Sequence, residues 1–156
     1  MSMNRKESEL LEKMFAISQY IFTLNNLLQE SGKTVGALSK SGKKIWGLLH
    51  ILHVNGMLTV PQVARKRAVS RQFIQRLAND LEEEGLVEFI DNPGHKRSKL
   101  MRMTPAGLKK YQEILAEIEK TFGELAMQFN LEDADTALNV LEEMSRAIAG
   151  HLETSK

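Results

Sequence analysis

The sequence contains no cysteine, which excludes disulfide bonds, thiolate zinc sites and cysteine redox sensors. It has no uninterrupted apolar run approaching the roughly 18–20 residues of a membrane-spanning helix. Its first residues, MSMNRKESELLEK, are polar and charged, unlike a secretory signal peptide. From these absences we expect a cytoplasmic protein with no membrane partner.

Catalytic and metal-binding motifs are also scarce. The chain has no Ser/His/Asp array, no paired-carboxylate motif and no glycine-rich phosphate loop, so we expect neither enzyme activity nor a cofactor. His50 and His53, three residues apart on an apolar segment, leave a metal site open as an alternative. Without a matched carboxylate or cysteine, the pattern favours structural or pocket-lining histidines, and we predict no metal.

The charge is unevenly distributed along the chain. The formal net charge of the 156 residues is only +1. Residues 58–110, however, carry 11 basic and six acidic side chains, a charge of +5, which leaves −4 on the rest. This basic middle between acidic flanks is hidden by the overall balance and indicates a polyanion as one class of partner.

Long amphipathic helices are expected at both ends. Residues 7–30 place apolar side chains at alternating spacings of four and three, at Leu10, Met14, Ile17, Ile21, Leu24 and Leu28. A second series begins at Leu108 and continues to Phe129, and a last helix opens at Asn130. Both series are more apolar than one small domain needs to cover, which favours association between chains.

The middle of the chain predicts shorter elements. Residues 43–54 read as an apolar helix that ends at Asn55-Gly56. Thr59, with Gln62 three residues later, is a candidate cap for a short helix over 60–66, and Ser70 caps a second helix that Gly85 ends.

A β-hairpin follows. Residues 87–90 and 100–103 read as strands, and between them Asn92-Pro93-Gly94 fits a type II turn with Pro at its second position and Gly at its third. Thr104-Pro105 then opens the next helix, with Pro at the first helical position.

The helix that begins at Ser70 has a face suited to DNA. With Ile74, Leu77, Ala78 and Leu81 turned inward, the opposite face carries Gln72, Gln75, Arg76 and Asn79. Arginine can bond guanine, and glutamine or asparagine can bond adenine, in the major groove. Two short helices, a tight corner and a basic hairpin therefore predict a winged helix-turn-helix.

The segment LTVPQVARKRAVSRQFIQRLANDLEEEGLVEFIDNPGHKRSKLMRMTPAG resembles the core of the MarR (multiple antibiotic resistance regulator) family. The shared pattern is a Ser-Arg start to the recognition helix, a Glu-Glu-x-Gly-Leu-Val end, a wing with paired basic residues, and Thr-Pro-x-Gly opening the next helix. The resemblance is close over residues 43–115. It implies a homodimer with interlocked terminal helices, a recognition helix in the major groove and a wing at the minor groove.

The chain departs from the family pattern at two positions. Arg67 stands before the corner, where the family usually has an apolar residue. Either its stem lies across the edge of the core with its charge toward phosphate, or the corner packs differently. His95 stands where relatives often carry an aspartate that braces a neighbouring arginine, so the wing gains a group that becomes cationic toward acid pH.

We therefore expect a mainly α-helical fold with a small hairpin, divided into a dimerisation helix and connection (1–40), a winged helix-turn-helix (41–104) and dimerisation helices (105–156). The expected function is that of a DNA-binding transcriptional regulator that acts as a repressor. The alternative is a winged-helix module that binds proteins and has no operator specificity. The expected DNA-binding residues are Thr59, Ser70, Arg71, Gln72, Gln75, Arg76, His95, Lys96, Arg97, Ser98 and Lys99.

A small-molecule effector remains open as a further partner. The resemblance implies that such a molecule would lie between the dimerisation and DNA-binding parts and weaken DNA binding. Its pocket would involve Trp46, His50 and His53, and the alternative for Trp46 is a place in the core.

Overall fold

The computed structural model describes residues 4–34, 38–39, 41–95 and 97–154. The chain divides into two compact units, Met1–Ala37 and Leu38–Lys156, which are described separately below. No helix in the described ranges is long and apolar enough to cross a membrane.

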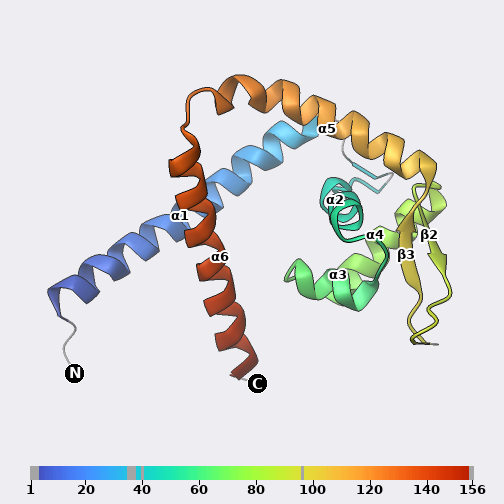
Figure 1. The fold of residues 1–156 in the computed structure, drawn as a ribbon, viewed down its shortest axis with the longest axis horizontal. Coiled ribbons are helices and arrows are strands. Elements are labelled where there is room, and N and C mark those ends of the chain that lie inside the picture. Colours follow the sequence, from blue (N-terminus) through green and yellow to red (C-terminus); the bar gives the residue numbers. More distant parts are fainter. Residues whose placement is uncertain (1–3, 35–37, 40, 96, 155–156) are drawn as a thin grey trace. The chain divides into compact units, whose positions relative to one another are not determined.

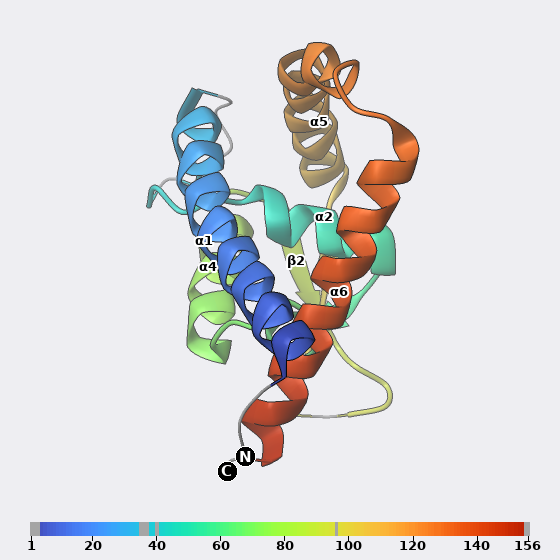
Figure 2. The ribbon, with the colours of Figure 1, turned by 90° about the vertical axis from the view of Figure 1, so that its left-hand side faces the viewer.

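The first unit holds one helix, α1 (Arg5–Thr34), which runs without interruption (Figures 1 and 2). Asn4 begins it: its Oδ1 accepts from the Glu7 backbone N–H at 2.9 Å, and the Glu7 carboxylate accepts from the Asn4 N–H at 2.8 Å. This reciprocal cap satisfies donors that a helix start leaves without partners. The helix predicted over 7–30 is confirmed and extends slightly at both ends.

The second unit contains five helices and three strands among its described residues. In chain order they are α2 (Trp46–Asn55), β1 (Leu58–Thr59), α3 (Val60–Lys66), α4 (Arg71–Glu83), β2 (Val87–Ile90), β3 (Leu100–Met103), α5 (Pro105–Ala126) and α6 (Leu131–Thr154). The prediction of a mainly helical winged helix-turn-helix with a small hairpin and long terminal helices is confirmed.

The core of this unit forms where α2, α3, α4 and the sheet meet. α2 packs on α5 and β3, α3 on α4, and α4 on β2. The four residues of α4 that the sequence turns inward are all buried. The largest fully buried side chains are Ile45, Leu48, Leu49, Val63, Ile74, Leu77, Leu81, Val87, Met101 and Ile114.

The sheet is antiparallel, in the order β1-β3-β2. Val87 pairs with Met103 and Ile90 with Leu100, so the hairpin predicted for the wing is confirmed. The two-residue strand β1 joins the other edge of β3, with Leu58 opposite Met101. The sequence does not predict it, because two residues are too few to show an alternating pattern.

Two helix limits differ from the sequence-based expectation. α2 begins at Trp46 instead of Lys43, because Lys44 pairs with Leu38 in a β-bridge and the Lys43 carbonyl accepts from the Ser39 N–H at 2.7 Å. α5 ends at Ala126, before Phe129. The remaining caps are as predicted: Thr104 Oγ1 accepts from the Gly107 N–H at 3.0 Å, and Asn130 Oδ1 from the Asp133 N–H at 2.8 Å.

Gly107 fixes the base of the hairpin on α5. A Cβ at this position would lie 1.9 Å from the Leu86 carbonyl oxygen, so only glycine permits this approach. The same carbonyl accepts from the Thr104 N–H at 3.1 Å, and the Thr104 hydroxyl donates to the Gly85 carbonyl at 2.6 Å. The turn between α4 and β2 is thus anchored to the start of α5.

Candidate nucleic-acid interface

The outward face of α4 is polar and exposed, as the sequence predicts. Arg71, Gln72, Gln75, Arg76 and Asn79 are all exposed on it. Side chains of these types can form hydrogen bonds with base edges or phosphates. The burial of the opposite face leaves this surface as the one that α4 can offer to a partner.

The corner before α4 is tight and involves a strained residue. Ala68 has a φ of 51°, a left-handed conformation that non-glycine residues seldom adopt. Ser70 follows as the N-cap of α4, and its Oγ accepts from the Phe73 N–H at 3.1 Å. This bond fixes where α4 begins, and Arg71 therefore stands at its first turn.

Thr59 has the role of a cap and is almost inaccessible. It is only 7% exposed. Its Oγ1 donates a hydrogen bond to Gln62 Oε1 at 2.9 Å, and Thr59 Oγ1 also accepts one from the Gln62 N–H at 3.4 Å. The capping box predicted for Thr59 and Gln62 is confirmed. The phosphate contact that the sequence suggests for Thr59 stays a prediction, with its hydroxyl already engaged inside the protein.

The wing turn lies at the predicted residues but is not of the predicted type. The His95 N–H donates to the Asn92 carbonyl at 3.1 Å, which closes a four-residue turn with Pro93 and Gly94 at its centre. A type II turn needs a positive φ at Gly94, and Gly94 is absent from the residues with positive φ, so that expectation is wrong. Pro at the second position suits a type I turn equally well.

Asn92 holds the two sides of the wing tip together. Its Oδ1 accepts from the Gly94 N–H at 3.0 Å, and its Nδ2 donates to the Ser98 carbonyl at 2.9 Å. His95 and Arg97 are exposed beside this brace. Lys96, which the sequence also assigns to DNA, lies outside the described residues.

A cleft of about 650 Å³ lies between α4 and the wing. It brings together six of the predicted DNA-binding residues, three from each side. From α4 they are Arg71, Gln72 and Gln75, and from the wing Arg97, Ser98 and Lys99. Ser70, Arg76 and His95 do not line it. The rest of its lining is Val60, Pro61, Asn79, Glu82 and Phe89.

The charges of the cleft suit an anionic partner along most of its length. Arg71, Arg97 and Lys99 contribute three cations, whereas among the described residues of the lining Glu82 is the single acidic side chain, and it comes from the last turn of α4. The helix N-terminus adds partial positive charge at the Arg71 end. The cations can therefore bind the phosphate backbone of a nucleic acid while the amide side chains face its bases.

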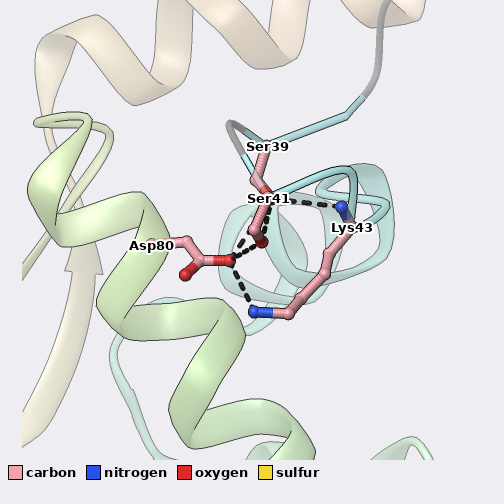
Figure 3. A network of polar contacts seen from close by, with 4 residues as sticks. All are labelled: Ser39, Ser41, Lys43 and Asp80. Carbon is pink, nitrogen blue, oxygen red and sulfur yellow. Dashed lines mark hydrogen bonds and ion pairs between the residues drawn. The ribbon is translucent and has the colours of Figure 1, made fainter.

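On another side of α4, a polar network ties the helix to the segment before α2 (Figure 3). One carboxylate oxygen of Asp80 accepts from Lys43 Nζ at 2.7 Å, from the Ser41 hydroxyl, and from the Ser39 hydroxyl at 3.3 Å. The hydrogen bonds from Lys43 and then Ser41 lower the pKa of Asp80 below its ordinary value. The sequence does not indicate this network, because its partners are 37 to 41 residues apart.

Arg67 does not extend toward the cleft. Its guanidinium lies over Gly47 in α2, where a Cβ on Gly47 would be 2.1 Å from Arg67 Nη1. Burial of this end lowers the pKa of Arg67 from its ordinary value. Of the two alternatives that the sequence leaves open, the structure has the corner packed differently, with the charge held against the first turn of α2.

The three residues expected to form an effector pocket lie in one aromatic cluster with Tyr111 of α5. The Trp46 and Tyr111 rings are stacked, with centroids 5.0 Å apart and planes 6° apart, and the His53 ring lies 4.5 Å from Tyr111. His50 Nδ1 is 3.1 Å from the Tyr111 hydroxyl. Tyr111 is 4% exposed, whereas both histidines are exposed.

The cluster therefore joins α2 to α5 through ring contacts. Among the described residues, no group of three histidine or acidic side chains is placed to hold a metal ion. Tyr111 lies within the apolar series that begins at Leu108, and the sequence gives no sign that it joins the other three residues. Its place beside them follows from the packing of α5 on α2.

Comparisons with known proteins find one family model and several similar proteins. Residues 46–98 match the model of the MarR family. An uncharacterized protein of Mycobacterium tuberculosis is 42% identical over 94 residues, which are 60% of this chain. The match spans only 65% of that relative's length. The transcriptional activatory protein BadR of Rhodopseudomonas palustris is 28% identical over 127 residues, 78% of this chain and 71% of BadR.

A solved structure with the same fold contains DNA. It is that of a mutant MarR of E. coli complexed with operator DNA, which is 18% identical, has a TM-score of 0.65, and aligns over 86% of this chain and 97% of that one. At this identity the likeness concerns the fold alone.

Proposed function

We propose that the chain is a DNA-binding transcriptional regulator of the MarR family, whose model matches residues 46–98. The observation that carries the proposal is the basic cleft, in which Arg71, Gln72 and Gln75 of α4 face Arg97, Ser98 and Lys99 of the wing. It combines cations for the phosphate chain with amides for bases, as sequence-specific DNA binding requires.

The proposed docking puts α4 in the major groove. There Arg71, Gln72, Gln75 and Arg76 meet bases or adjacent phosphates, and the Ser70 end of the helix approaches the backbone. Arg97 and Lys99 hold the backbone and enter the minor groove, with His95 and Lys96 at the wing tip. A phosphate contact by Thr59 would require its hydroxyl to leave the cap that it forms with Gln62.

We propose that the chain binds DNA as a homodimer. Residues 41–104 would form the DNA-binding part, and 1–40 and 105–156 the dimerisation parts. Two copies related by a two-fold axis would read a pseudopalindrome with half-sites about 34 Å apart. Whether binding represses or activates depends on where the operator lies relative to the promoter; we propose repression, the usual result of an occupied operator.

A small-molecule effector is a second proposal, favoured by the aromatic cluster. Trp46, His50 and His53 stack around the buried Tyr111 between two helices, and the two exposed histidines add polar ring nitrogens. A ligand that binds better to one arrangement of α2 and α5 would shift the population of DNA-competent dimers.

Selection of bound sequences from a random duplex pool tests the main proposal. We expect an enriched motif with two-fold symmetry and half-sites one helical turn apart. Lys109→Ala serves as a matched control, since Lys109 is a basic residue on the exposed surface of α5, and it should give the same motif. Binding without an enriched motif, or no binding, would favour the alternative of a protein-interaction module.

A further inference from the structure

Two amide side chains of α4 are already joined to each other. Gln75 Nε2 donates a hydrogen bond to Asn79 Oδ1 at 2.8 Å. The residues are four apart, so they stand one above the other on the same helix face. Both are exposed, and both line the cleft between α4 and the wing. The bond therefore lies on the surface proposed to face the bases.

The bond engages one donor of Gln75 and the acceptor of Asn79 and leaves the other hydrogen-bonding groups of the two amides free. A primary amide has two N–H donors and one carbonyl acceptor. Gln75 retains its Oε1 acceptor and one Nε2 donor, whereas Asn79 retains both Nδ2 donors and has its oxygen engaged. Gln75 can thus still accept and donate at once, whereas Asn79 is left chiefly as a donor.

The hydrogen-bonding groups left free on Gln75 and Asn79 match different base edges in the major groove. Adenine offers its N6 amino group as a donor and N7 as an acceptor, which together suit the free acceptor and donor of Gln75. The Nδ2 donors of Asn79 suit an acceptor, which guanine offers at O6 and N7 and thymine at O4. Four residues of helix rise about 6 Å, between one and two base steps, so the two amides can reach neighbouring base pairs.

We infer that Gln75 and Asn79 form one reading unit, in which Asn79 holds the Gln75 amide oriented for adenine and itself reads an acceptor on a neighbouring base. Asn79 is thus both a specificity-determining residue and a positioning residue. The inference rests on the proposed function, because the unit reads bases only if α4 enters the major groove.

The bond also prepares Gln75 before DNA arrives. A free glutamine side chain samples many rotamers and must give up that freedom on binding. A side chain already fixed in its bound orientation loses less, which strengthens its binding to the base edge that this orientation fits. Gln72 provides the contrast: it lines the same cleft, and in the described part of the chain its side chain has no hydrogen bond.

The experiment compares motifs selected by the wild type and by single variants. We expect Asn79→Ala to flatten the preference at two base positions, its own and the adenine of Gln75, by about tenfold at the latter. Gln75→Ala should lose the same adenine preference, and at that adenine position the double variant should lose no more than Gln75→Ala alone. Gln72→Ala should leave both positions unchanged.

Asn79→Asp makes the test sharper. Aspartate keeps an oxygen acceptor for Gln75 Nε2 but has no donor, so the adenine preference should survive. The neighbouring position should change toward cytosine, whose N4 group donates to a carboxylate. Preferences are compared as ratios between sequences, because the added negative charge weakens binding to all DNA.

A measurement on the free protein separates the brace from DNA binding. In ¹⁵N-labelled protein, the side-chain amide resonances of Gln75 should shift in Asn79→Ala and stay near their wild-type positions in Asn79→Asp. Unchanged Gln75 resonances in Asn79→Ala, or an equal loss of affinity for all sequences, would overturn the inference. A wild type that enriches no motif would overturn the proposed function, and the reading unit with it.

Discussion

Asp80 controls how the recognition helix is held against the segment that precedes α2. Its carboxylate accepts hydrogen bonds from Lys43, Ser41 and Ser39, and Lys43 is also its ionic partner at 2.7 Å. All three donors lie on the segment that precedes α2, so the network joins the helix that bears Trp46 to the helix proposed to read DNA.

The lowered pKa of Asp80 predicts a pH-dependent contribution to stability. Because the folded-state pKa lies below the unfolded value near 4, this contribution is present above about pH 4 and is lost as the pH falls through the folded pKa. We expect Asp80→Asn to lower the thermal midpoint by a few degrees at neutral pH, with a smaller difference from wild type below about pH 4. Thermal unfolding at equal chain concentrations measures it.

Lys43 supplies the partner control for this experiment. Lys43→Gln should lower the thermal midpoint by a similar amount at neutral pH. The double variant should lower it by less than the sum of the two single changes. Lys109→Gln, on the exposed surface of α5, should have little effect. A difference between Asp80→Asn and wild type that is equal at neutral and acid pH would show that the ionised pair is not its source.

Single residues were predictable where their partners are near in sequence. The caps Thr59, Ser70 and Thr104 depend on groups three positions away, so their pattern is visible in the chain itself. The partners of Asp80 and Arg67 are not visible in this way, since the tertiary fold brings Lys43 and Gly47 to them. The wing turn is a different case: its contacts are local, but Pro at the second position suits both type I and type II turns, so the sequence located the turn without fixing its type.

The wing is the element whose role depends most on charge. Arg97 lines the cleft opposite α4. If it holds a phosphate, Arg97→Ala should weaken binding to all duplexes alike and reduce the slope of log affinity against log salt by about one per chain. Titration of operator and unrelated duplexes at several salt concentrations measures both quantities.

Arg102 is the matched control for Arg97 because it lies on the same hairpin. Its Nε donates to the Glu88 carboxylate at 2.8 Å, so its charge is already compensated within the sheet. Arg102→Ala removes the same formal charge and should reduce the salt slope less. Equal slopes for Arg97→Ala and wild type would remove Arg97 from the phosphate contacts.

At the scale of whole helices, the sequence predicted type and order well, because long series and strong caps identify them. The start of α2 was predicted less accurately and β1 was not predicted, because both depend on backbone pairing, of Lys44 with Leu38 and of Leu58 with Met101. The apolar series also ran past the end of α5, which lies at Ala126. The cleft combines both cases, since its residue types were readable in sequence, whereas the bond between Gln75 and Asn79 required the structure.

The whole molecule exposes more large apolar side chains than a single chain needs. On α1 they include Leu10, Phe15 and Phe22, each more than half exposed. On α6 they include Leu138 at 58% and Leu152 at 59%. Contiguous exposed apolar faces on long helices indicate contact with another protein surface. We expect that surface to be a second copy of the chain, as the resemblance to the MarR family implies.

We therefore expect a particle of twice the 17.6 kDa chain mass in light scattering or sedimentation at micromolar concentration. Leu138→Lys places a charge on the apolar face of α6 and should shift the equilibrium toward monomer, because an unpaired charge is costly to bury. Asn139→Lys adds the same charge at the next, exposed position on the polar face and should leave the dimer intact. Helicity by circular dichroism checks that each variant is folded. If the wild type is monomeric, or if both variants remain equally dimeric, this face of α6 is not the interface between copies.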